Sequence, residues 1–203
     1  MDILAHALWT AGGAVPLRRR LRRPLSVGWA AFWGVFPDVF IFAIPALVRI
    51  WWYLTGTTKT LLPDAHGPQH FQYVWTLYYA SHSLIVFGLI FGIAWLVARR
   101  PILEMLGWGL HILIDIPTHQ GIFALHFLWP LSSYGISGFR WENRWFFAAN
   151  YAALFLLYFW LWIGARRRRF LKDSHIEAAM PHRVANPTAP LRFQPFLRTL
   201  TRP

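Results

Sequence analysis

The chain has 203 residues, of which 56% are hydrophobic and only 14% are charged, and soluble domains carry roughly 25% charged residues. This composition therefore argues against a soluble protein and favours an integral membrane protein. The formal net charge is +12, but the basic residues are clustered beside apolar segments, so we predict anionic lipid rather than nucleic acid as the partner of this charge.

The first two apolar segments are both irregular. Residues 2–17 predict a short helix with Asp2 as its N-cap, shorter than an ordinary span of about 20 residues, which either inserts partway into the membrane or lies at its surface. An arginine cluster at residues 18–20, 22 and 23 follows it. Residues 26–48 predict a span interrupted at Pro37-Asp38 and again at Pro45, because proline removes a backbone donor and bends or breaks a helix.

Two more spans and a polar loop follow. Residues 55–76 are polar and predict a loop, whereas residues 79–98 predict an uninterrupted span of 20 residues that two arginines close. Residues 101–128 predict a third long span with Pro117 near its far end, and residues 129–144 predict a turn-rich loop.

The last span is the most regular. Residues 145–165 are apolar and rich in aromatic side chains, and the arginines at 166–169 end the segment. From about residue 170 the chain is polar, basic and proline-containing, which predicts a largely irregular tail over 170–203.

Together these segments predict an all-α, polytopic membrane helix bundle over residues 1–169, with four long spans plus a short N-terminal inserted helix. The positive-inside rule places the arginine clusters and the tail in the cytoplasm and the loops 55–76 and 129–144 in the periplasm, as expected for an inner (plasma) membrane protein. If residues 2–17 do not insert, the bundle has four spans and both ends face the cytoplasm.

Six side chains that can bind a metal lie in or beside the apolar segments, where ionisable groups are energetically expensive. A helix rise of about 1.5 Å per residue places all of them roughly 15–27 Å from the cytoplasmic end of their span, provided that residues 2–17 insert. The chain has no cysteine, so imidazole and carboxylate are the ligands available, and these suit Zn²⁺, Mn²⁺ or Fe²⁺. The six are His6, Asp38, His82, His111, Asp115 and His119.

The strongest local pattern is His111, Asp115 and His119, which are spaced four apart and would share one face of a regular helix, although Pro117 opens the turn before His119. Taken singly, each histidine is more often a packing residue and Asp38 a capping carboxylate. As a set they indicate a metal site, because a cation surrounded by imidazoles removes the cost of burying carboxylates. Ligating imidazoles need outer hydrogen-bond partners, and the candidates for this role are Ser81, Ser83 and Thr118.

These residues also carry a family resemblance. The chain resembles small bacterial inner-membrane proteins described as metal-dependent hydrolases, over about residues 1–165. The motifs that carry it are Asp2-x-x-x-His6, Phe36-Pro37-Asp38, Ser81-His82-Ser83, His111-x-x-x-Asp115 with His119, and Trp129-Pro130.

That family is distantly similar to the zinc-dependent phospholipase C and P1-type nuclease group of helical phosphodiesterases. The resemblance implies that Asp115 is a bridging carboxylate and that Asp38 is a ligand that also orients water. The chain departs from that group in two ways, since it has no N-terminal tryptophan and a shorter spacing between Asp115 and the last histidine. The resemblance therefore implies one or two metal ions rather than three.

The sequence thus predicts a membrane-embedded, metal-dependent hydrolase that acts on a phosphoester of a lipid or lipid-linked substrate through metal-activated water. Asp38 and Asp115 are its predicted catalytic residues, and the cofactor is a divalent metal, Zn²⁺ for preference. Two alternatives stay open: a small cation or proton transporter, and a non-catalytic scaffold that a metal stabilises. Transporters usually show internal repeats, which this short chain lacks.

Overall fold

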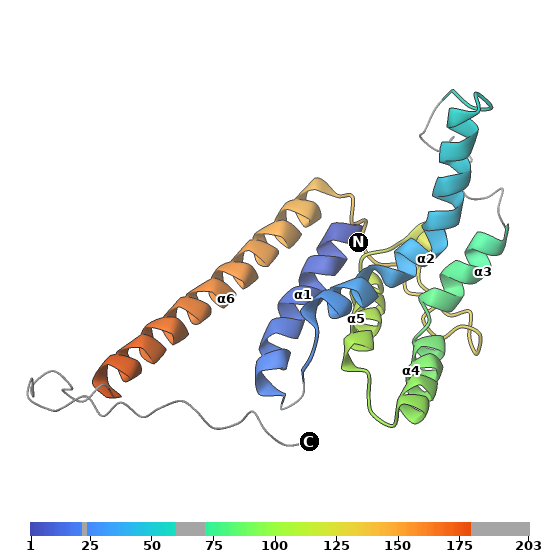
Figure 1. The fold of residues 1–203 in the computed structure, drawn as a ribbon. Helices are drawn as coiled ribbons and strands as arrows, with labels where there is room; N and C mark the ends of the chain where they lie inside the picture. The colour runs from blue at the N-terminus through green and yellow to red at the C-terminus, as the bar shows by residue number, and fades with distance from the viewer. Residues whose placement is uncertain (22–23, 60–71, 180–203) are drawn as a thin grey trace, which may run out of the picture. The chain divides into compact units, whose positions relative to one another are not determined.

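The computed structural model describes residues 1–21, 24–59 and 72–179, and the chain divides into two compact units, Met1–Leu161 and Trp162–Pro203. The described residues are helical, apart from turns, irregular segments and one isolated antiparallel bridge between Leu125 and Ile136, so the all-α prediction is confirmed. In chain order (Figure 1) the elements are α1 (Ile3–Arg20), α2 (Val27–Leu54), α3 (Gln72–Ser81), α4 (Leu84–Ala98), η2 (Leu103–Met105), α5 (Leu106–Asp115), η3 (Gly121–Phe123) and α6 (Arg144–Ala179).

Helix α1 begins as predicted, because the Asp2 side chain accepts a hydrogen bond of 2.9 Å from the Ala5 amide. It continues to Arg20, beyond the predicted end at residue 17, and its last turn carries three arginines. Positive charge at a helix C-terminus interacts favourably with the helix dipole, which accounts for the extension.

Helix α2 is capped by Ser26 and runs through Pro37 without ending, six residues beyond the predicted end of this span. The segments Val27–Ala43 and Pro45–Leu54 meet at an angle of 47°, so the predicted interruption at Pro45 is a bend.

The predicted uninterrupted span over 79–98 is wrong, because the helix breaks at His82 and Ser83 and turns by 67° between α3 and α4. The Ser83 hydroxyl accepts from the Ile85 and Val86 amides at 3.1 and 3.2 Å and so caps a new helix. The Leu84 amide donates to the Phe127 carbonyl, 2.9 Å away, which supplies a partner that a continuous helix would not need.

The predicted long span over 101–128 is also wrong. Helix α5 has only 10 residues, about 15 Å, and ends at Asp115, two residues before Pro117. Its apolar character comes from burial inside the protein, since Trp108, His111 and Ile112 are all nearly inaccessible. After α5 the chain turns, forms η3 and makes the bridge at Leu125.

Two predicted irregular segments need correction as well. Residues 72–76 of the predicted loop 55–76 belong to α3, because Val74 and Tyr78 are buried in the core; residues 60–71 lie outside the described residues. Residues 170–179 of the predicted tail continue α6, in keeping with the good helix formers among them, and residues 180–203 again lie outside the described part of the chain. The predicted domain boundary at 169 therefore falls inside α6.

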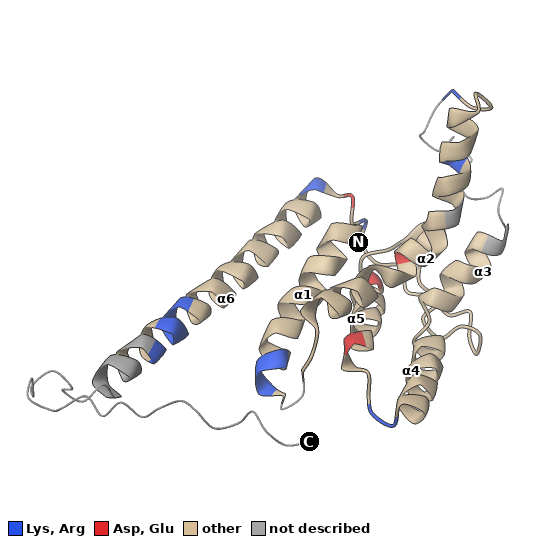
Figure 2. Cartoon of the chain, in the orientation of Figure 1, with Lys and Arg blue, Asp and Glu red and all other residues tan. Residues whose placement is uncertain are grey.

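Within the described residues, one helix is long and apolar enough to cross a membrane, the stretch Arg144–Lys172 of α6. The number rises to at most three if the bent pair in α2 and the bent pair α3–α4 each form one broken span. Four long spans are thus not confirmed. Figure 2 shows basic residues gathered at the end of α1 and in the turn after α4, whereas Arg49 lies inside α2.

Helix α2 is central to the first unit and packs against α1, α3 and α5. Its closest approach to α5 is made through glycines. A Cβ on Gly107 of α5 would press into the Ala30 carbonyl oxygen and lie 2.8 Å from Thr10 Cγ2 and 3.0 Å from the Gly34 nitrogen. Glycine at this crossing therefore lets α5 lie directly on α2, and the two helices bring their polar residues together.

Candidate metal centre

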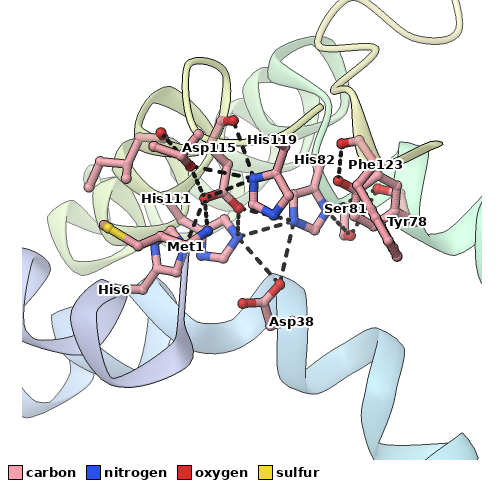
Figure 3. A network of polar contacts seen from close by, with 12 residues as sticks. Met1, His6, Asp38, Tyr78, Ser81, His82, His111, Asp115, His119 and Phe123 are labelled. Atoms are coloured by element: carbon pink, nitrogen blue, oxygen red, sulfur yellow. Dashed lines mark hydrogen bonds and ion pairs between the residues drawn. The ribbon is translucent and has the colours of Figure 1, made fainter. Parts of the chain in front are cut away.

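Four buried side chains converge between α2, the α3–α4 break and α5. They are Asp38 of α2, His82 at the break, and His111 and Asp115 of α5. Each offers a ligand atom, and these atoms all lie within 4.8 Å of one another. The group could hold a metal ion. Figure 3 shows the four side chains pointing toward one another from three segments that are distant in the sequence.

The distances within the group are short. The Nε2 atoms of His82 and His111 are 3.1 Å apart. His111 Nε2 lies 3.2 Å from Asp115 Oδ2, and His82 Nε2 lies 3.7 Å from the same oxygen. Asp38 is held more loosely, since its Oδ1 atom is 3.6 and 3.7 Å from the two Nε2 atoms and its side chain is 11% exposed.

The other nitrogen of each ring fixes the tautomer. His111 Nδ1 lies 2.7 Å from the Gly34 carbonyl oxygen, and His82 Nδ1 lies 3.0 Å from the Tyr78 carbonyl oxygen. A carbonyl oxygen can only accept, so these contacts assign the N–H to Nδ1 in both rings. Both Nε2 lone pairs then face the centre of the group, as in histidines whose outer nitrogen is anchored for metal binding.

Two facing lone pairs 3.1 Å apart need a positive charge between them. Two nitrogens bound to one tetrahedral zinc ion lie about 3.3 Å apart, close to this spacing. In addition, Asp115 Oδ2 is fully buried and makes no hydrogen bond among the described residues. A buried carboxylate oxygen without a donor is costly, so the donor set fits a cation.

Two further predicted ligands, His6 and His119, surround Asp115 and lie outside the group of four. His6 Nε2 is 3.0 Å from Asp115 Oδ1, without the direction of a hydrogen bond, and the His6 ring stacks on His111 at 3.8 Å. His119 Nδ1 is 3.4 Å from the same oxygen. The Met1 amino group also reaches it, at 2.6 Å. The two carboxylate oxygens of Asp115 therefore face different partners: Oδ2 faces His82 and His111, and Oδ1 faces the N-terminal residues Met1 and His6.

His119 follows α5 and lies at the edge of the site, with a side chain 13% exposed. Burial lowers the pKa of its imidazole to about 4, against the opposing effect of the Asp115 carboxylate. The ring is therefore neutral at pH 7 and has a lone pair available.

The three hydroxyl residues take different places. Ser81 Oγ lies 3.0 Å from His82 Nδ1, and Thr118 Oγ1 donates to Asp115 Oδ1 at 3.2 Å. The Ser83 hydroxyl instead caps α4 and donates to the Trp129 carbonyl, and it has no contact with the group of four among the described residues.

Three partners of the site were not predicted from the sequence. The carbonyls of Gly34 and Tyr78 orient the two imidazoles, and the Met1 amine contacts Asp115. Backbone groups carry no residue-type signal, so only the tertiary structure could reveal them.

The chain was also compared with known proteins. No family model matches it, and neither the curated proteins nor the solved structures contain a significant match.

Proposed function

We propose that this protein is a membrane-embedded, metal-dependent hydrolase that cleaves a phosphoester of a lipid or lipid-linked substrate. The observation that supports it most directly is the pair of Nε2 atoms of His82 and His111, 3.1 Å apart, beside the carboxylates of Asp38 and Asp115. Imidazole and carboxylate donors with anchored outer nitrogens are the usual ligands of catalytic zinc sites.

His82, His111, Asp115 and Asp38 would hold the ion. His6 and His119 lie beside Asp115 Oδ1 and would complete a second position once the Met1 amine, which binds that oxygen at 2.6 Å, has left it. Bound there, a divalent cation such as Zn²⁺ supplies Lewis acidity, which polarises a phosphoryl group and lowers the pKa of water. Asp115 would contribute Oδ2 on the side of His82 and His111, and its Oδ1 faces His6 and His119.

Asp38 is the group that we propose as the base. It is the least tightly held of the four ligands, and it is the most exposed of them. Its carboxylate is therefore the group best placed to accept a hydrogen bond from water and to take up a proton. Ser81 and Thr118 hold their partners in position and do not touch the reacting atoms in this proposal.

A membrane substrate follows from the surroundings of the site. Helix α2, which carries Asp38, exposes several large apolar side chains, for example Leu47 and Trp51, which are both 65% exposed. Such exposed apolar surface is stable when lipid covers it. In this proposal a lipid phosphoester reaches the site from the membrane.

The test is turnover by the purified protein in detergent, with a generic phosphodiester and with mixed phospholipids, followed by product analysis. Asp38→Asn is expected to lower kcat by about 10²- to 10⁴-fold, the usual contribution of a general base. The variant should keep most of its metal, because Asp38 is the most weakly associated ligand.

His126→Ala is the matched control, since His126 stacks on Tyr79, 4.6 Å away, and belongs to no described metal group. It should retain turnover. A wild-type protein that is fully loaded with metal yet releases no product from any phosphoester would refute the hydrolase.

A further inference from the structure

A cavity of about 290 Å³ opens at the edge of the carboxylate and histidine cluster. Its lining includes Thr118 and His119, which follow α5, and Arg140, Trp141 and Glu142, which precede α6. Thr118 Oγ1 and His119 Nδ1 lie 3.2 and 3.4 Å from Asp115 Oδ1. The wall of the cavity is therefore in direct contact with the carboxylate at the centre of the site.

Two backbone hydrogen bonds fix the segment that precedes Arg140. The Gly138 amide donates to the His119 carbonyl at 2.7 Å, and the Phe139 amide donates to the Pro117 carbonyl at 2.8 Å. A Cβ on Gly138 would lie 2.8 Å from Pro117 Cα, so only glycine permits this approach. Residues 140–142 follow immediately, so the loop that ends α5 also holds them at the cavity.

Arg140 is the one guanidinium or ammonium group among the described residues that line the cavity. Its Nη2 atom lies 3.1 Å from Glu142 Oε2, and both side chains are more than half exposed, at 66% and 56%. Exposed pairs of this kind contribute about 0–1 kcal/mol, so another anion can displace the carboxylate. The planar fork of arginine matches a phosphate group, which it can bind through two parallel hydrogen bonds.

We propose that this cavity binds the phosphate group of the substrate, with Arg140 as the residue that recognises the anion, and that the ester enters the site past His119. This inference rests on the proposed function. A volume of about 290 Å³ is at the lower end for ligand pockets, which suits a phosphorylated headgroup and leaves the acyl chains outside. A soluble phosphomonoester shares this chemistry, and the experiment separates the two sources.

Equilibrium dialysis measures the binding of radiolabelled glycerol 3-phosphate to the full-length protein in phosphate-free maltoside micelles. Arg140→Gln is expected to weaken binding at least about tenfold, through the loss of a charge-assisted, bidentate contact. Glu142→Gln should tighten binding a few-fold, because it removes the competing carboxylate. Arg144→Gln removes the same charge four positions away, outside the cavity lining, and should change binding less than about twofold.

Phosphatidic acid or phosphatidylglycerol added to the micelles identifies the source. Displacement of the label by these lipids supports a lipid headgroup, and displacement only by soluble phosphomonoesters supports a soluble substrate. The inference is overturned if the wild type does not bind the label, or if Arg140→Gln and Arg144→Gln weaken binding equally.

The two proposals fail separately. If binding depends on Arg140 but no phosphoester is turned over, the phosphate-binding proposal stands and the hydrolase proposal is refuted. If Arg140→Gln leaves turnover unchanged, the hydrolase proposal stands and the cavity has no part in its mechanism.

Discussion

Asp115→Asn is expected to lower the affinity of the protein for a divalent metal by at least about 100-fold and to abolish phosphoester turnover. Loss of an outer hydrogen-bond partner alone costs about 10- to 100-fold in metal affinity. Asp115 is itself one of the four proposed ligands, so its loss should cost at least as much. Its two oxygens lie 3.0 Å from His6 Nε2 and 3.2 Å from His111 Nε2. Metal content after gel filtration and competition with a chelator measure the loss.

The variant should remain folded, because asparagine has the shape of aspartate and can still accept from the Thr118 hydroxyl. Circular dichroism and a monodisperse elution profile check this. Glu104→Gln is the control for removing a carboxylate, since Glu104 accepts from the Ser26 amide at 3.0 Å and belongs to no described metal group. An Asp115→Asn protein that keeps a full complement of metal would contradict the role given to this carboxylate.

Gly107→Ala is expected to destabilise the protein by about 3 kcal/mol, at the upper end of the range for overpacked cores. The added methyl group would meet the Ala30 carbonyl and the Gly34 nitrogen, which are backbone atoms that cannot rotate away. Relief requires α5 to move from α2, and this would separate His111 and Asp115 from Asp38. We therefore expect metal affinity to fall together with stability, as measured by denaturation in mixed micelles.

Gly13→Ala is the matched control, because a Cβ at Gly13 of α1 meets nothing within 4 Å. Alanine is the better helix former, so this variant should be as stable as the wild type or more stable. If Gly107→Ala proves equally stable and keeps its metal affinity, the contact between α2 and α5 described above is wrong.

A local sequence signal predicted one helix boundary, the N-terminus of α1. Asp2 was recognisable as an N-cap because it precedes an apolar segment, and the structure confirms its hydrogen bond to Ala5. The apolar run after residue 144 predicted a helix able to span a membrane, and α6 has this length and composition.

The interior breaks could not be predicted in the same way. Ser83 lies within an apolar run, and nothing in the run shows that its hydroxyl will cap a new helix and contact Trp129. The run from residue 101 was ambiguous, because a buried helix and a membrane span have the same apolar composition. In the structure α5 is a short helix that is buried on most sides, and this burial is a tertiary property that the sequence does not show.

The candidate site shows the same division. The spacing of His111 and Asp115 placed them on one face, and the structure brings Asp38 and His82 to that face. A straight helix would have put His119 about two turns from His111. The chain instead turns after Asp115, and His119 Nδ1 lies 3.3 Å from the Asp115 carbonyl oxygen. Its place at the edge of the cavity follows from that turn.

X-ray absorption spectroscopy at the zinc edge, on protein loaded with zinc and dialysed, tests most directly whether Asp38, His82, His111 and Asp115 share one cation. We predict close to one or two zinc ions per chain and the multiple-scattering pattern of at least two imidazoles, with oxygen completing the shell. Dialysed protein that retains no zinc, or zinc surrounded by oxygen without imidazole, would contradict a metal centre built on His82 and His111.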